Sequence, residues 1–216
     1  MRDSIARRCW IVLVLVLAVG AASPAQAQLS DLDVRLSAGM IFPSGTFADY
    51  FDPGPSVGLT LVRPAGDRAG FMLELAFERL GRQQHTYVPY TNLWRYQVGG
   101  EIDVIGGADN VLSLRPYARV GATTYRSDYF KVVGRVENWE DLPERFSHTY
   151  LSGTGGLRLV VRPGDGMTWF VNGELGWSPV GEADAEVLRT VSLEPLDTFS
   201  AATTMALTMG LSFRTR

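Results

Sequence analysis

The sequence contains little cysteine, lysine or histidine, and these shortages exclude several kinds of site. Its 216 residues include one cysteine, Cys9, one lysine, Lys131, and two histidines. A single cysteine excludes a disulfide scaffold and a cysteine-rich zinc centre. The formal net charge of −3 argues against nucleic acid as a partner, because anionic polymers select basic surfaces. With 46% hydrophobic and 20% charged residues, the composition also excludes a disordered chain.

Long apolar runs are equally scarce, and the one that is present lies at the N-terminus. Three arginines among the first eight residues precede an apolar run from Cys9 to Ala22, and an Ala-x-Ala cleavage pattern ends at Ala27. This run is shorter than the roughly 20 residues that a membrane-spanning helix needs. We therefore expect residues 1–27 to be a secretory signal peptide and residues 28–216 to form one cysteine-free domain.

Helical periodicity is hard to find in residues 28–216, where hydrophobic and polar residues alternate with period 2. Such alternation is typical of β-strands with one apolar and one polar face. Three connections, 64–70, 106–110 and 163–167, are short and rich in turn-forming residues, whereas the other four are long. The pattern predicts an all-β, closed, up-and-down antiparallel barrel. Its eight strands are expected at 32–42, 56–63, 71–80, 93–104, 111–125, 148–162, 168–178 and 200–213.

Two eight-stranded barrels compete for this pattern. A soluble lipocalin-like barrel has apolar residues inside, whereas a transmembrane barrel has them outside, facing lipid. The polar face carries five arginines and five carboxylates, which balance to zero, as buried charges that must pair would do. We therefore expect a lumen ion-pair network of Arg35, Glu74, Glu78, Arg95, Glu101, Asp103, Arg115, Arg119, Arg158 and Glu174.

The connection 106–110 also predicts the strand register. If it is a five-residue loop, Glu101 lies opposite Arg115, and Gln97 lies opposite Arg119, across an antiparallel ladder.

Aromatic residues on the apolar face gather toward the two ends of the predicted strands. Two aromatic girdles around an aliphatic band are typical of membrane interfaces, although strands are enriched in aromatics in general. The expected interface residues are Phe71, Trp169 and Phe213 at the short-turn end, and Phe77, Trp94, Tyr96 and Trp177, together with Phe42, toward the long-loop end.

From these features, residues 29–216 resemble the eight-stranded outer-membrane β-barrel proteins, the OmpA-barrel-like or porin-like family. The resemblance rests on the meander, the opening segment Leu36–Gly45 and the last strand. It implies an outer-membrane location in a Gram-negative bacterium, surrounding lipid, and barrel-insertion machinery that acts on the C-terminal strand. As in that family, the last strand is apolar and ends on an aromatic residue, with Leu207, Met209, Leu211 and Phe213, although Arg214–Arg216 follow it.

Candidate catalytic residues are few. His148 shares a strand face with Ser152, but strand geometry separates them by roughly 13 Å, too far for a hydrolase triad. Glu101 and Asp103 are roughly 7 Å apart by the same geometry, and ion pairing with arginines is the better interpretation of both. His85 is interpreted as a polar loop residue. We therefore expect no catalytic, metal or cofactor site.

These observations predict an outer-membrane barrel with a structural, envelope-integrity or surface-interaction role and a plugged, ion-paired lumen. The long loops would meet an extracellular partner, and no enzymatic activity is expected. Two alternatives stay open. One is a secreted lipocalin-like barrel that binds a small apolar ligand, and the other is a lipid-modifying outer-membrane enzyme that uses His148.

Overall fold

The computed structural model describes residues 32–82, 90–106, 110–128, 145–163, 168–181 and 201–214. All of them lie in one compact unit, Leu32–Arg216. The expected signal peptide at 1–27 and His85 lie outside the described residues.

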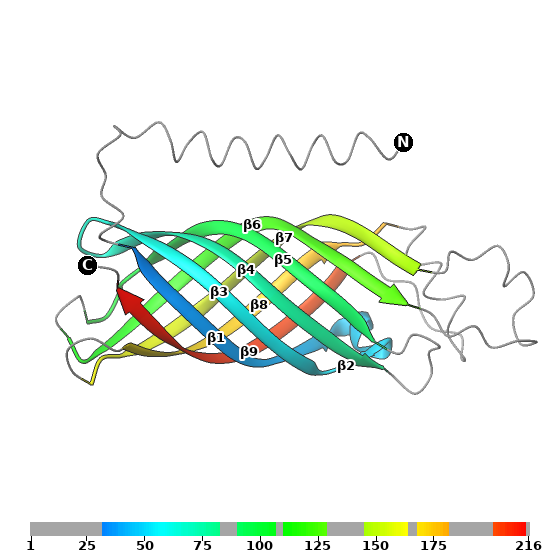
Figure 1. Ribbon diagram of the computed structural model, residues 1–216, viewed down its shortest axis with the longest axis horizontal. Helices are drawn as coiled ribbons and strands as arrows, with labels where there is room; N and C mark the ends of the chain where they lie inside the picture. Colours follow the sequence, from blue (N-terminus) through cyan, green and yellow to red (C-terminus); the bar gives the residue numbers. More distant parts are fainter. Residues whose placement is uncertain are drawn as a thin grey trace, which may run out of the picture. The chain divides into compact units, whose positions relative to one another are not determined.

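Eight long antiparallel strands close into a barrel in the part of the chain that the structure describes (Figure 1). Each pairs with two neighbours, because β1 joins β9 and β4 joins β5 in addition to the meander pairings. The predicted closed, up-and-down barrel is confirmed. The strands are β1 (Asp33–Ser44), β3 (Gly54–Ala65), β4 (Ala69–Arg82), β5 (Thr91–Ile102), β6 (Leu112–Asp128), β7 (Arg145–Val161), β8 (Thr168–Pro179) and β9 (Ala201–Arg214).

Two short elements occupy the connection between β1 and β3, which the sequence pattern presents only as a loop. They are a 3₁₀ helix, η2 (Gly45–Asp49), and a two-residue strand, β2 (Phe51–Asp52). Strand β2 pairs with the end of β4, where Phe51 lies opposite Arg82. Both elements lie at the long-loop end of the barrel, opposite the turn between β3 and β4 (Figure 1).

Among the described residues, no helix is long and apolar enough to cross a membrane.

The predicted register between β5 and β6 is wrong by two residues. Glu101 lies opposite Tyr117, and Gln97 lies opposite Gly121. The last bridge of the hairpin joins Ile105 to Leu114, so residues 106–113 form the connection rather than the predicted 106–110. Four residue steps on one strand then oppose three on the other, which is a β-bulge. A shift of two residues preserves which face each side chain occupies, so the two faces of the sheet are unaffected.

The two faces of the closed sheet have opposite polarity. Large apolar side chains point outward, as shown by the exposed fractions of 69% for Phe71, 69% for Leu151 and 66% for Met209. Inside, Arg119 and Glu78 are 2% and 0% exposed. A soluble barrel has the reverse arrangement, and a barrel in lipid has this one.

Candidate functional site: the barrel lumen

Strand pleating places every second side chain of each strand in the lumen. The inward positions are odd-numbered on β1, β5 and β6, and even-numbered on β3, β4, β7, β8 and β9. These positions, together with Asp103 directly after β5, carry all ten charged residues that the sequence pattern assigned to the polar face. The structure places each of them in at least one ion pair. They form two groups, one in each half of the lumen.

The Glu101 cluster lies toward the short-turn end, and its centre is one carboxylate held by three arginines. Arg35 donates two hydrogen bonds to Glu101, at 2.6 and 2.7 Å. Arg115 donates one at 3.0 Å, and Arg158 donates one at 2.6 Å. The arginines need further acceptors, since one carboxylate cannot balance three positive charges. These are Asp33 for Arg35 at 2.7 Å, Asp103 for Arg115 at 3.1 Å, and the amide oxygen of Asn172 for Arg158 at 2.7 Å.

The Glu174 cluster lies toward the long-loop end and contains two arginines and three carboxylates. Arg95 forms ion pairs with Glu174 at 2.6 Å and Glu78 at 2.8 Å. Arg119 pairs with Glu174 at 2.6 Å and also with Glu74. One oxygen of each carboxylate accepts a hydrogen bond from a hydroxyl group. The donors are Ser56 to Glu78, Thr60 to Glu74, and Tyr117 to Glu174 at 2.9 Å.

Tyr117 links the two clusters, and the sequence pattern places it on the polar face without assigning it a role. Its ring lies between two guanidinium groups, with the Cζ of Arg119 4.8 Å and the Cζ of Arg158 5.0 Å from the ring centroid. Gly156 leaves the space for this ring, because a Cβ there would lie 2.6 Å from the Tyr117 hydroxyl. The sequence signal for this role is the position of Tyr117 in β6 between Arg115 and Arg119, because all three residues face the lumen.

Neutral polar side chains on the inner face of β5 and β7 are hydrogen-bonded to one another next to the Glu174 cluster. The Gln97 amide nitrogen donates to Ser152 at 3.0 Å, and its amide oxygen accepts from Thr154 at 2.9 Å. Because Gln97 is on β5 and both partners are on β7, these bonds pass over β6, where Gly121 lies between Gln97 and Ser152. Together with the two clusters, they fill the middle of the lumen with paired polar groups.

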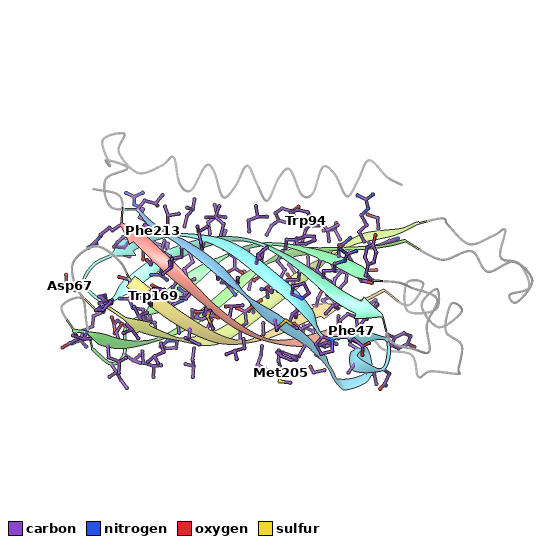
Figure 2. All side chains as sticks on the ribbon, turned by 60° about the horizontal axis from the view of Figure 1, so that its bottom comes forward. Phe47, Asp67, Trp94, Trp169, Met205 and Phe213 are labelled. Atoms are coloured by element: carbon purple, nitrogen blue, oxygen red, sulfur yellow. The ribbon has the colours of Figure 1, made fainter. Side chains whose placement is uncertain are left out.

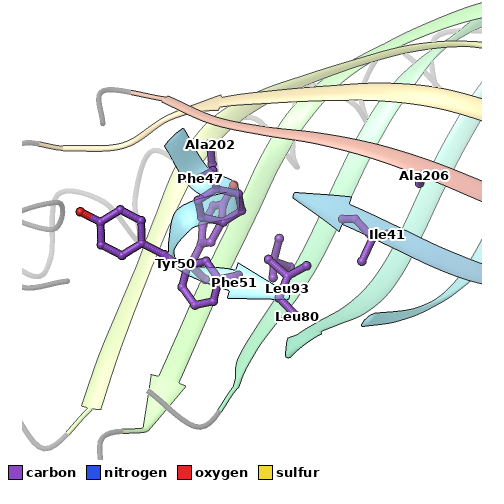
Figure 3. Close-up of a cluster of buried hydrophobic side chains, with 9 residues drawn as sticks. Ile41, Phe47, Tyr50, Phe51, Leu80, Leu93, Ala202 and Ala206 are labelled. Carbon is purple, nitrogen blue, oxygen red and sulfur yellow. The ribbon is translucent and has the colours of Figure 1, made fainter. Parts of the chain in front are cut away.

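The long-loop end of the lumen is apolar instead. Phe47, Tyr50 and Phe51, from η2 and the segment that follows it, fold inward as an aromatic plug (Figure 3). The Phe47 ring centroid is 4.9 Å from that of Phe51 and 6.4 Å from that of Tyr125. Sequence reasoning missed this plug. The sequence signal for it is the occurrence of three aromatic residues within five positions of one connection, 47–51. They pack against Ile41, Leu80, Leu93, Tyr125, Ala202 and Ala206.

Some of the outer-face aromatic side chains lie toward the ends of the barrel, whereas Tyr96 lies opposite Leu75 in the middle of β5 and β4. Trp169 and Phe213 lie toward the end that carries Asp67, and Trp94 lies toward the opposite end (Figure 2). Trp94 packs against Phe77 with ring centroids 4.7 Å apart. The predicted interface residues that are exposed on the outer face are Phe71, Trp169, Phe213, Trp94, Tyr96, Trp177 and Phe42.

The candidate catalytic groups are not arranged as a triad. His148 is exposed and stacks on Tyr150, with ring centroids 6.3 Å apart. Ser152 is buried, and its hydroxyl accepts the hydrogen bond from Gln97. Glu101 and Asp103 are both engaged by Arg115. Within the described ranges, no group of three or more histidine, cysteine, aspartate or glutamate side chains could hold a metal ion.

Comparison with known proteins shows that the fold is shared with bacterial outer-membrane barrels. Neisserial surface protein A superposes with a TM-score of 0.58 at 9% identity, over 85% of this chain and 96% of that one. OprG of Pseudomonas aeruginosa gives a TM-score of 0.51 at 11% identity, over 86% and 96% of the two chains. A major outer membrane protein of Thermus thermophilus gives 0.50 at 11% identity, over 84% and 99%.

No protein-family model matches the sequence, and no curated protein matches it.

Proposed function

We propose that this protein is a lipid-embedded barrel of a bacterial outer membrane, that its lumen is closed, and that its role is structural or surface-interacting rather than catalytic. The observation that carries this proposal is the polarity of the barrel. Its outer face is apolar and exposed, and its interior is charged and ion-paired. The shared fold with outer-membrane barrels supports the same conclusion.

The outer face supports a lipid environment because its apolar area is continuous around the barrel. Leu36 on β1, Leu73 on β4, Leu157 on β7, Leu175 on β8 and Leu207 on β9 are all between 48% and 65% exposed. Soluble monomers rarely expose contiguous apolar patches of more than a few hundred Å². The lipocalin-like alternative requires an apolar ligand cavity, whereas the middle of the described lumen contains the two ion-pair clusters.

A closed lumen follows from how firmly its contents are held. Displacing one member of a buried ion pair leaves an uncompensated charge and costs about 3–5 kcal/mol. An ion that crosses the barrel would have to break several such pairs and also pass the aromatic plug. We therefore propose that the barrel does not conduct ions, and that its interior serves to hold the wall together.

Interaction with other molecules then falls to the outer surface and to the connections at the long-loop end. Strand β9 presents Leu207, Met209, Leu211 and Phe213 on the lipid face, which suits recognition by barrel-insertion machinery. The long connections would meet extracellular partners. Catalysis is not favoured, because His148 and Ser152 are separately engaged by Tyr150 and Gln97.

Membrane fractionation of a Gram-negative host tests the location. The full chain should appear in the outer-membrane fraction and migrate differently in gels before and after boiling. The variant Leu75→Arg places a charge in the middle of the outer face and should reduce insertion, since such a charge costs about 2–4 kcal/mol. The matched variant Ala65→Arg places it at the short-turn end of β3 and should insert normally. Recovery of the wild-type protein as a detergent-free soluble barrel would refute the location.

Planar-bilayer recording tests the closed lumen separately. The refolded protein should show no steps above the background of protein-free bilayers. A stable conductance of the kind that water-filled porins produce would refute closure without affecting the location.

A further inference from the structure

The strongest unassigned feature of the described chain is an open cavity at the short-turn end of the lumen. Its volume is about 430 Å³. It lies between the Glu101 cluster and the turn between β3 and β4, and it is separate from the aromatic plug at the other end. Small-molecule sites typically have volumes of about 300–1,000 Å³. We call this cavity the vestibule.

Among the described residues, five arginines and four carboxylates line the vestibule. The carboxylates are Asp33, Asp67, Glu101 and Asp103, and the arginines are Arg35, Arg68, Arg115, Arg162 and Arg214. Three of the carboxylates already serve the interior, because Asp33, Glu101 and Asp103 form the ion pairs of Arg35 and Arg115.

The remaining basic side chains form a cationic rim around the opening. Arg68 lies in the turn between β3 and β4, Arg162 directly follows β7, and Arg214 ends β9. Arg162 donates a hydrogen bond to the backbone oxygen of Asn110 at 3.0 Å. Among the described residues, neither Arg68 nor Arg214 forms an ion pair, and Asp67 is the one remaining carboxylate of the lining.

Electrostatic interactions at Arg162 show that other arginines of the vestibule lie near it. Burial lowers the pKa of Arg162 below its usual value, and the charges of Arg115 and Arg35 lower it further, whereas Asp103 and Asp33 raise it. An anion in the vestibule would relieve this repulsion. Guanidinium groups bind the oxygens of phosphates and carboxylates through paired, charge-assisted hydrogen bonds.

We propose that the vestibule is a binding site for a small oxyanion, a phosphate or a dicarboxylate, held by Arg162 and Arg214. Access from the periplasm rests on the proposed orientation in an outer membrane, in which the short turns face inward. Binding itself depends only on the folded barrel. A ligand bound in the vestibule would meet the Glu101 cluster from the short-turn end and would not enter the middle of the lumen.

Calorimetric titration of the full chain, refolded in maltoside micelles, tests the site with inorganic phosphate and with succinate as probes. Binding should be measurable at low ionic strength. The variant Arg162→Gln should weaken it about tenfold, as expected for the loss of one charge-assisted contact. The double variant with Arg214→Gln should abolish it. Boiling-dependent gel migration checks that each variant is folded, so lost binding is separable from lost structure.

The matched control is Arg63→Gln, which removes the same charge from the same end of the barrel. Arg63 is exposed on β3 opposite Phe71 and does not line the vestibule. Its removal should leave both dissociation constants unchanged. Stronger binding of phosphate than of succinate would identify the ligand as phosphate-bearing, and the reverse would identify a dicarboxylate.

Three results would overturn the proposal. They are no binding of either probe to the folded barrel, equal weakening by Arg63→Gln, and complete displacement by chloride at equal ionic strength. Failure of the membrane proposal would be seen in fractionation instead, and it would leave these titrations unaffected.

Discussion

The middle and the long-loop end of the lumen are filled by different kinds of side chain. In the middle, charged side chains from opposite walls pair across the barrel, as Arg95 on β5 does with Glu174 on β8. At the long-loop end, one connection folds inward and contributes Phe47 and Phe51. Ion pairs depend on every partner being present, whereas apolar packing depends on volume. The two regions should therefore respond differently to the same kinds of substitution.

The largest effect is expected for Arg119→Met in the Glu174 cluster. Arg119 pairs with Glu74 and Glu174, so its loss leaves two carboxylates without that partner in a buried site. The free energy of unfolding should fall by about 3–5 kcal/mol. Urea unfolding in lipid vesicles, followed by boiling-dependent gel migration, measures this change. The variant Arg63→Met, on the outer face, should differ little from the wild type, and equal losses would show that the cluster is not special.

A smaller effect, about 3 kcal/mol, is expected for Phe47→Ala in the aromatic plug, as for other large-to-small changes at buried aromatic sites. The same vesicle assay measures it. The loss should be insensitive to salt, because no charge is removed. Phe71→Ala on the outer face, where the ring is already exposed, is the control. If Phe47→Ala unfolds no more easily than this control, the plug does not contribute to stability.

Removing one hydroxyl from each region compares the two directly. Tyr117→Phe removes the hydrogen bond to Glu174 and should cost about 2 kcal/mol, since bonds to charged groups are worth about 1.5–3 kcal/mol. Tyr150→Phe, beside the plug, should cost almost nothing, because the buried Tyr150 hydroxyl has no hydrogen-bond partner among the described residues. The urea midpoints of the two variants, measured under the same conditions, test this difference. Equal losses of stability would contradict it.

The smallest effect, about 1 kcal/mol, is expected for Gly156→Ala, because overpacking a filled interior strains it. The added methyl group would press on the Tyr117 ring and on the backbone oxygen of Gly173, and the urea midpoint in the same vesicle assay should report the loss. Gly173→Ala is the matched control, since nothing lies within 4 Å of its Cβ position. A loss in the control as large as that in Gly156→Ala would assign the effect to strand glycines in general.

Local sequence pattern predicted most of the strands because one physical rule governs each of them. In a half-buried strand, polarity alternates with period 2, and a charged residue on the wrong face is costly. Strands β5 and β8 therefore lie within two residues of their predicted bounds. The register between β5 and β6 was not predictable in this way, because a bulge near Ile105 changes pairing without changing the alternation.

The aromatic plug shows a second limit of sequence reasoning. Phe47, Tyr50 and Phe51 carry no periodic pattern, and apolar residues in a connection are equally compatible with an exposed loop. Their burial depends on Leu80, Leu93 and Ala202, which come from distant strands. No rule of local spacing connects these positions.

By itself, the sequence determined a cysteine-free, eight-stranded barrel with an apolar face and a charge-balanced polar face. It did so because alternation and composition are properties of each strand alone. Only the tertiary structure decided which charges meet, how Tyr117 joins the two clusters, how the long-loop end is filled, and where the vestibule stays open. Those features depend on closure of the sheet, which brings side chains from non-neighbouring strands to within hydrogen-bond distance across the lumen.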